Sequence, residues 1–118
     1  MKKILLGLIA ALVSSLAFAQ AYPSKPIRVM VAFPPGGPTD IIARLVSPKI
    51  SDLLGQPVVV ENVTGAGGNI ATARVAKAEP DGYTVLLHSS GFAVNPALSA
   101  NAGYDPQKDF VPVAIIAS

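Results

Sequence analysis

The fold is set by residues 27–40, which read Ile27-Arg28-Val29-Met30-Val31-Ala32-Phe33-Pro34-Pro35-Gly36-Gly37-Pro38-Thr39-Asp40. The first half of this stretch is apolar and rich in β-branched side chains, so residues 27–33 are predicted to form a strand. Prolines and glycines make residues 34–38 a loop. Thr39 or Asp40 is then expected to cap a helix. Strand, loop and helix together are the first unit of an α/β fold.

The predicted helix runs to Gly55, which fits the C-cap position. Pro48 lacks the amide that would bond back to Arg44, so a kink or a short break is expected there. The apolar side chains of the helix fall near helical spacing and give it one apolar face, made of Ile41, Ile42, Leu45, Val46, Ile50, Leu53 and Leu54.

The same alternation continues to the end of the chain. Further strands are predicted at residues 57–62, 83–88 and 113–117, with helices at residues 69–78 and 93–98. Strands that alternate with helices and are apolar on both faces indicate a parallel sheet covered by helices. The predicted fold class is therefore α/β.

The amino terminus has the three-part layout of a secretory signal. Lys2 and Lys3 precede an apolar run over residues 4–18, and Ala17-Phe18-Ala19 presents small residues for cleavage after Ala19. A membrane anchor is the alternative, but the run has about fifteen residues and a spanning helix needs about twenty. Residues 1–19 are therefore predicted to be a cleaved signal peptide, and the protein is expected in the periplasm.

Charge and cysteine content exclude several classes of function. The chain has nine Lys and Arg against seven Asp and Glu, and removal of Lys2 and Lys3 with the signal leaves a formally neutral chain. A neutral chain has no basic patch for nucleic acid. Without any Cys there is no lipid anchor, disulfide, thiolate zinc site or cysteine nucleophile. No metal or cofactor is expected.

The remaining length suits only part of a larger protein. Residues 20–118 are enough for one small domain. The apolar stretch Val113-Ala114-Ile115-Ile116-Ala117-Ser118 reads as a buried strand, and a strand left at an edge invites mispairing. We therefore expect residues 20–118 to be the amino-terminal portion of a first ligand-binding domain, with a second domain missing.

A ligand site is expected at the carboxyl ends of the strands, where open α/β sheets bind ligands. Three loops lie there, at residues 34–39, 63–68 and 89–91, and none has a charged residue before its helix begins. Glycine lets the backbone approach a ligand closely, and amides at a helix start are unpaired and favour anions. The pattern predicts an anion site built from backbone amides.

Each of these features also has a purely structural explanation. Gly36 and Gly37 fit a tight turn, and Ser89 with Ser90 fits a cap for a short helix. Asp40 is expected to be a helix cap rather than a ligand contact. Its carboxylate would repel an anion placed beside it, so its side chain should turn into its own helix or bind through water.

The aromatic side chains leave alternatives open too. His88, the only His, is expected to be a structural residue rather than a ligand group. Tyr83 and Tyr104 are expected to pack. Phe33 and Phe92 flank the candidate loops, where they either wall an apolar part of a ligand or simply pack.

The sequence lacks the motifs of nucleotide binding and of nucleophilic catalysis. The third glycine of a dinucleotide fingerprint would stand at Ile70, and no Gly-Lys-Ser/Thr loop occurs. Ser89-Ser90-Gly91 lacks the preceding glycine of a nucleophile elbow. Catalysis by this segment is not expected.

A family resemblance covers essentially all of the chain after the signal. The chain resembles the substrate-binding proteins of tripartite tricarboxylate transporters, often called the Bug family. The matching motifs are Tyr22-Pro23-Ser24-Lys25-Pro26-Ile27-Arg28, Pro35-Gly36-Gly37-Pro38-Thr39-Asp40 with Ala43-Arg44, Leu54-Gly55-Gln56-Pro57-Val58-Val59-Val60-Glu61-Asn62, Gly65-Ala66-Gly67-Gly68-Asn69, Pro80-Asp81-Gly82-Tyr83-Thr84, Asn95-Pro96-Ala97-Leu98 and Tyr104-Asp105-Pro106 with Asp109-Phe110.

The resemblance implies a periplasmic-binding-protein-like fold of type II, with two domains whose cleft closes on a ligand. It implies binding of a small carboxylate (a tricarboxylate, a dicarboxylate or an aromatic acid) and delivery to the membrane permease subunits of the transporter, by a protein expected to be a monomer. In the family, loops after the first strands hold one carboxylate through backbone amides and water. With Phe33 and Asp40 added from the residues themselves, the candidate ligand-binding residues are Phe33, Gly36, Gly37, Thr39, Asp40, Gly67, Gly68, Ser89 and Ser90.

One departure and two alternatives remain. The family often has a basic residue and a proline where this chain has Val63 and Thr64, which removes a charge near the cleft. An exported sensing or scavenging module of the same fold, not coupled to transport, would have the same loops. An exported enzyme would need turnover that depends on His88 or Ser90.

Overall fold

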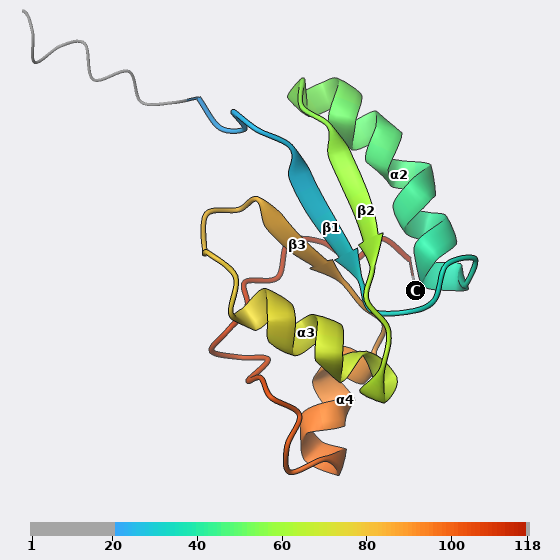
Figure 1. Cartoon of the computed structure of the whole chain (residues 1–118), viewed down its shortest axis with the longest axis vertical. Helices are drawn as coiled ribbons and strands as arrows, with labels where there is room; N and C mark the ends of the chain where they lie inside the picture. The colour runs from blue at the N-terminus through green and yellow to red at the C-terminus, as the bar shows by residue number, and fades with distance from the viewer. Residues whose placement is uncertain (1–20, 118) are drawn as a thin grey trace, which may run out of the picture.

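A three-stranded parallel sheet forms the centre of the structure, a computed structural model that describes residues 21–117. Its strands are β1 (Ile27–Val31), β2 (Val58–Asn62) and β3 (Thr84–Leu87), in the order β2-β1-β3. All three point toward one edge of the sheet (Figure 1). The predicted α/β fold, a parallel sheet with flanking helices, is confirmed. The predicted signal peptide lies outside the described residues.

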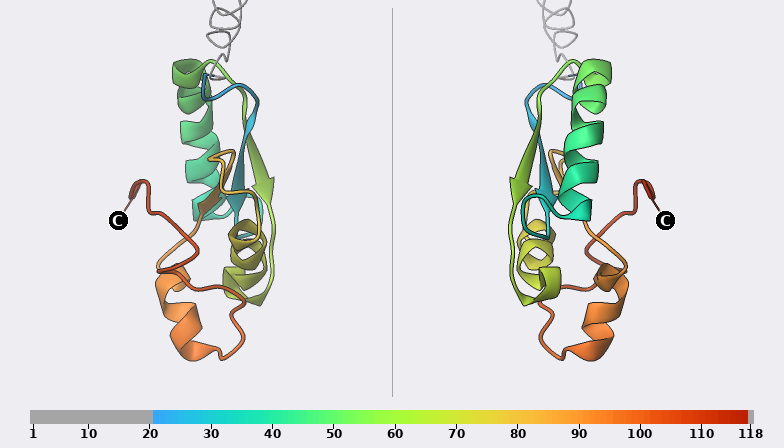
Figure 2. Two further views of the ribbon diagram at one scale, coloured as in Figure 1. Left: turned by 90° about the vertical axis from the view of Figure 1, so that its left-hand side faces the viewer. Right: turned by 90° about the vertical axis from the view of Figure 1, so that its right-hand side faces the viewer.

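Two helices cover opposite faces of this sheet. Helix α2 (Pro38–Leu54) packs along β1 and β2, and α3 (Asn69–Ala76) packs along β1 and β3. On one face of the sheet, Met30 shares a core with Ala71 of α3. Its neighbour in β1, Val29, pairs with Val60 of β2, and Val60 faces α2 on the other side of the sheet. Because successive strand residues point to opposite faces, the two helices sandwich the sheet (Figure 2).

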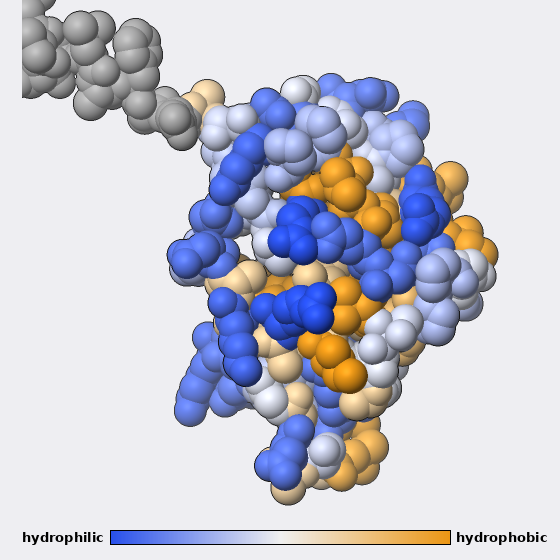
Figure 3. All heavy atoms as spheres, in the orientation of Figure 1, coloured by the Kyte–Doolittle hydropathy of each residue, from blue (hydrophilic) through white to orange (hydrophobic). Residues whose placement is uncertain are grey.

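The core is small and depends on alanines at the helix–sheet contacts. Met30, Val31, Ala43 and Ala71 are almost fully buried, with Ala43 and Ala71 at 0% exposure. Short side chains at these positions let the helices approach the strands closely. Considerable apolar surface remains outside this core (Figure 3), including Leu45 and Leu53.

Helix α2 differs from the prediction at its start and at its middle. Its N-cap is Gly37, with no side-chain cap, and Pro38 is the first helical residue. Neither Thr39 nor Asp40 is therefore the cap, because proline presets the helical φ angle at the first position. The helix also continues past Pro48 without a break, because packing against two strands outweighs one missing hydrogen bond. Gly55 is the predicted C-cap, with φ of 70°.

The predicted fourth strand is wrong. Residues 113–117 form no strand in the part of the chain that the structure describes, and Val113 and Ile115 are 86% and 89% exposed. An apolar, β-branched run becomes a strand only beside a partner backbone that takes its hydrogen bonds. The segment lies beside no such partner here.

Two further helical elements complete the described chain. The 3-10 turn η1 (Ala66–Gly68) precedes α3, and α4 (Gly91–Leu98) follows β3, which places α4 below the carboxyl edge of the sheet in Figure 1. Within residues 21–117, no helix combines the length and apolar character that crossing a lipid bilayer requires.

Candidate functional site

The predicted site residues lie at one edge of the sheet, as expected from the direction of the strands. The first loop (residues 32–37) follows β1, the glycine loop (residues 63–68) follows β2, and residues 88–90 link β3 to α4. The glycine loop crosses this edge to reach β3, since a Cβ built on Gly68 would meet both Ala32 and His88. The sequence therefore predicted correctly which segments meet, and the ligand role of their residues stays a prediction.

The buried side chain of Asp40 holds the first loop in place. Its side chain is 3% exposed and accepts hydrogen bonds from the Gly36 amide at 2.8 Å, Arg44 Nε at 3.0 Å and Asn62 Nδ2 at 2.9 Å. Asn62 Nδ2 also donates to the Phe33 carbonyl at 3.0 Å. The carboxylate thus joins the first loop to α2 and to the end of β2.

These contacts determine the charge state of Asp40. The hydrogen bonds from Arg44, then from the Gly36 amide and from Asn62, lower the pKa of the Asp40 carboxyl to about 2. Asp40 is therefore ionised at neutral pH and turned into its own helix, as expected of a carboxylate beside an anion site. Its contacts are internal to the protein rather than directed outward.

Hydrogen bonds within the protein occupy two of the predicted amide donors and leave others. The Gly36 amide is occupied by Asp40, and the Gly37 amide donates to the Pro34 carbonyl at 3.3 Å. Among the described residues, the amides of Thr39 and Asp40 donate to no protein acceptor. They lie in the first turn of the 17-residue helix α2, where the helix dipole favours an anion.

Asn62 and Arg44 were not predicted as site residues. Arg44 Nη2 donates to Asn62 Oδ1 at 3.0 Å, which orients the amide that holds Phe33 and Asp40. An Asn directly at the carboxyl end of a buried strand is a signal that could have indicated this role. The role of Arg44 depends on its position one turn after Asp40 on α2.

The glycine loop has an unusual run of left-handed backbone. Four successive residues have positive φ angles: Gly65 at 125°, Ala66 at 50°, Gly67 at 65° and Gly68 at 96°. The Gly68 amide donates to the Gly65 carbonyl at 3.0 Å, and the Asn69 amide donates to the Ala66 carbonyl. The Gly67 amide has no protein acceptor within residues 21–117.

His88 packs against the glycine loop. A Cβ on Gly68 would lie 2.2 Å from His88 Nε2, a buried nitrogen with no hydrogen-bond partner in the part of the chain that the structure describes. Nδ1 lies 3.0 Å from the Ser89 carbonyl, which can only accept, so Nδ1 carries the proton and Nε2 is the unprotonated acceptor. Burial lowers the pKa of His88. These contacts favour the structural role over a ligand role.

The aromatic side chains near α4 form one packed group. The Phe33 and His88 rings are 5.1 Å apart, and Phe92 packs on Tyr104 at 5.7 Å and on Phe110 at 5.1 Å. The Tyr104 hydroxyl donates to the Phe92 carbonyl at 2.9 Å. Tyr104 is therefore a packing residue, as predicted.

Ser89 and Ser90 are exposed at the start of α4. Ser90 is the N-cap residue of this helix, but its side chain makes no capping hydrogen bond. Their carbonyls accept from the Phe92 and Ala93 amides at 3.0 Å and 3.2 Å, so the turn is closed by backbone alone. Both hydroxyls are thus available to a ligand.

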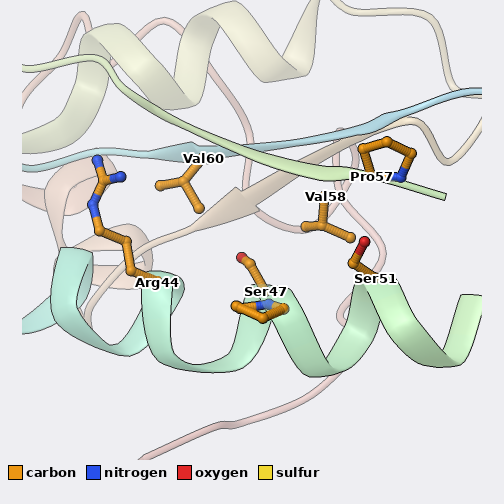
Figure 4. A pocket seen from close by; sticks show the side chains of 7 residues that line it. Arg44, Ser47, Ser51, Pro57, Val58 and Val60 are labelled. Atoms are coloured by element: carbon orange, nitrogen blue, oxygen red, sulfur yellow. The ribbon is translucent and has the colours of Figure 1, made fainter.

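A groove of about 370 Å³ lies elsewhere, between α2 and β2 (Figure 4). The Ser47 and Ser51 hydroxyls point into it, but both already donate hydrogen bonds within the protein. Ser47 donates to the Ala43 carbonyl at 2.6 Å, and Ser51 donates to the Gln56 carbonyl at 2.9 Å. The groove therefore offers few free polar groups. Among the described residues, no cluster of His, Cys, Asp or Glu is arranged to hold a metal ion.

Comparison with known proteins gives one consistent family. Residues 42–118 match the family described as "Tripartite tricarboxylate transporter family receptor". The chain is 48% identical over 100 residues to protein BugT of Bordetella pertussis, a match that covers 83% of this chain and 31% of BugT. The chain thus spans about a third of the length of the curated relatives it matches.

Solved structures agree with this match. The periplasmic binding protein BugD is 48% identical with a TM-score of 0.73, over 75% of this chain and 30% of BugD. MatC from Rhodopseudomonas palustris, solved with bound malate, is 42% identical with a TM-score of 0.69, over 80% of this chain and 33% of MatC. The chain belongs to the tripartite tricarboxylate transporter receptor family, whose members are periplasmic binding proteins.

Proposed function

We propose that this chain forms one wall of a periplasmic site that captures a small carboxylate for a tripartite transporter. The observation that carries the proposal is a set of amides without a protein acceptor among residues 21–117, those of Thr39 and Asp40 at the start of α2 and that of Gly67 in the glycine loop, at one edge of the sheet. MatC, a relative of the same fold, was solved with bound malate, a dicarboxylate.

The physical reason is the match between donors and an oxyanion. Charge-assisted hydrogen bonds to backbone amides contribute about 1.5–3 kcal/mol each, so two or three account for micromolar affinity when little ordering is needed. The first loop is already ordered by Asp40, which keeps this cost low. The Ser89 and Ser90 hydroxyls add neutral donors without adding negative charge.

The candidate ligand residues follow from this geometry. The amides of Thr39, Asp40 and Gly67 and the hydroxyls of Ser89 and Ser90 supply donors to the carboxylate, while Phe33 borders the site. The Asp40 side chain, Gly36, Gly37 and Gly68 shape the loops rather than bind directly.

The wider role is proposed from the family. The protein works in the periplasm after its signal peptide is removed, passes its ligand to the permease subunits, and catalyses no reaction. A second domain supplies the other wall of the cleft, since this chain covers about a third of its relatives. On this basis residues 21–117 alone bind carboxylates weakly, because a carboxylate held on one side stays hydrated.

A thermal-shift screen of the complete gene product tests the proposal. The panel contains citrate, malate, adipate, benzoate and the neutral diamide of malate. A ligand at a hundred times its dissociation constant should stabilise the protein by about 2.7 kcal/mol, which raises the melting temperature measurably. Stabilisation by one or more carboxylates but not by the diamide supports the proposal. Stabilisation by neutral compounds alone, or by none of the panel, contradicts it.

A further inference from the structure

Asn95 of α4 lies between two walls of the proposed site. Its Nδ2 donates to the Gly67 carbonyl at 2.9 Å and to Asn69 Oδ1 at 2.9 Å. A Cβ built on Gly91 would lie 3.6 Å from both terminal atoms of the Asn95 side chain. The side chain therefore folds back toward the start of its own helix while it holds the glycine loop.

The orientation of this amide is determined by its partners. The Gly67 carbonyl can only accept, so the group that faces it is the NH₂ of Asn95, and Asn69 must then present its oxygen. Both hydrogens of the Asn95 amide are used, and a carboxylate of the same shape could supply neither.

The contact fixes the peptide group beside the unpaired Gly67 amide. The Gly67 carbonyl is held by Asn95, and the amide of the same peptide group, that of Gly68, is held by Gly65. The Ala66 carbonyl accepts from the Asn69 amide, and a trans peptide sets its N–H opposite its C=O. The Gly67 amide consequently points out of the loop, away from these contacts.

We propose that Asn95 is a positioning residue, which locks the glycine loop to α4 so that the Gly67 amide and the Ser90 end of α4 form one rigid donor surface. The proposal rests on the proposed function for the identity of the ligand, a small carboxylate. It assigns Asn95 no contact with that ligand. Its contribution is to prevent a loop of four left-handed residues from sampling other conformations.

The test uses a matched pair of substitutions in the complete gene product. Asn95→Asp removes both donors, whereas Asn69→Asp keeps the acceptor that Asn95 requires. Each adds one negative charge, at atoms that lie 2.9 Å apart, so electrostatic repulsion of a ligand is nearly the same in both. Asn95→Ala removes the donors without adding charge and covers the case in which Asn95→Asp does not fold.

Hydrogen exchange without ligand measures how strongly Asn95 holds the glycine loop. The Gly68 amide should exchange about fivefold to tenfold faster in Asn95→Asp and Asn95→Ala than in the unchanged protein, because one or two hydrogen bonds are lost. Asn69→Asp should leave its exchange nearly unchanged. Equal exchange in all four proteins, or equal acceleration in Asn69→Asp and Asn95→Asp, overturns the proposal.

Titration with malate and with citrate measures the functional consequence. Asn95→Asp and Asn95→Ala should weaken binding about tenfold, more than Asn69→Asp does. Affinity unchanged by the Asn95 substitutions overturns the positioning role.

The two proposals fail in different ways. If the unchanged protein binds neither these acids nor the rest of the panel, the proposed function is wrong, and the exchange data still decide whether Asn95 holds the loop. If it binds but the Asn95 variants bind equally well, the function stands and this inference falls.

Discussion

The first loop and the glycine loop are neighbours at one edge of the sheet and border the proposed site, yet they are held by different chemistry. The first loop is fixed by an ionised carboxylate, that of Asp40, with Arg44 and Asn62 around it. The glycine loop is fixed by neutral groups, with Asn95 on one carbonyl and Thr72 Oγ1 on the Gly68 carbonyl at 2.8 Å. Two loops with similar donors should therefore respond differently to substitution and to acid.

The largest difference is expected when a methyl group is added to each loop. Gly68→Ala places a Cβ 2.2 Å from His88 Nε2 at a φ angle of 96°, so strain and overpacking should together destabilise the fold by about 3 kcal/mol. Gly36→Ala meets nothing within 4 Å and adds backbone strain alone, about 1 kcal/mol. Urea denaturation of both variants measures the two values, and equal losses would show that His88 does not confine Gly68.

Removal of Asp40 should have the next largest effect. Asp40→Ala leaves the Gly36 amide and one hydrogen of Asn62 without their acceptor, so the melting temperature should fall by about 5 °C. Asp52→Ala, an exposed carboxylate on the same helix, is the matched control and should change it by less than about 1 °C. Similar shifts in the two variants would mean that the first loop does not depend on Asp40.

Acid should destabilise the two loops in different pH windows. The pKa of Asp40 is lowered to about 2, so its stabilisation is complete above about pH 4 and is lost as the pH falls toward about 2. Burial lowers the pKa of His88, so the unfolded chain binds its proton first and stability falls as the pH drops below about 6.5.

Urea midpoints across this range separate the two windows. Asp40→Asn should reduce the loss of stability in strong acid, to which Glu61, Asp81 and Asp105 also contribute, and His88→Gln should remove the loss just below about pH 6.5. A His88→Gln protein that keeps the full pH dependence of the unchanged protein would show that the imidazole is not the titrating group.

The smallest expected effect comes from Thr72. Its side chain is fully buried and donates to the Gly68 carbonyl, so Thr72→Val should cost about 1 kcal/mol. Ser47→Ala removes the equivalent hydrogen bond from α2 to the Ala43 carbonyl and is the control on the other face of the sheet. Calorimetry of both variants measures the loss of stability. If hydrogen exchange at the Gly68 amide is faster in neither variant, Thr72 stabilises α3 alone.

Periodicity predicted the sheet and its helices because the pattern of apolar residues is local information. It failed at residues 113–117, where an apolar run needs a partner strand that a local pattern does not contain. The meeting of the three candidate loops at one edge of the sheet was predicted because parallel strands all end there, and their ligand role stays a prediction. The contacts of Asn95 were missed, because its two partners lie 28 and 26 residues away in the sequence.

The most direct test of the account is the amide NMR spectrum of the complete gene product during titration with malate or citrate. The unpaired amides of Thr39, Asp40 and Gly67 should shift most, since these are the proposed donors to the carboxylate. The amides of Gly36 and Gly68, which are already bonded within the protein, should shift less. Binding that leaves the three unpaired amides unshifted would contradict the central claim that backbone donors at this edge hold the ligand.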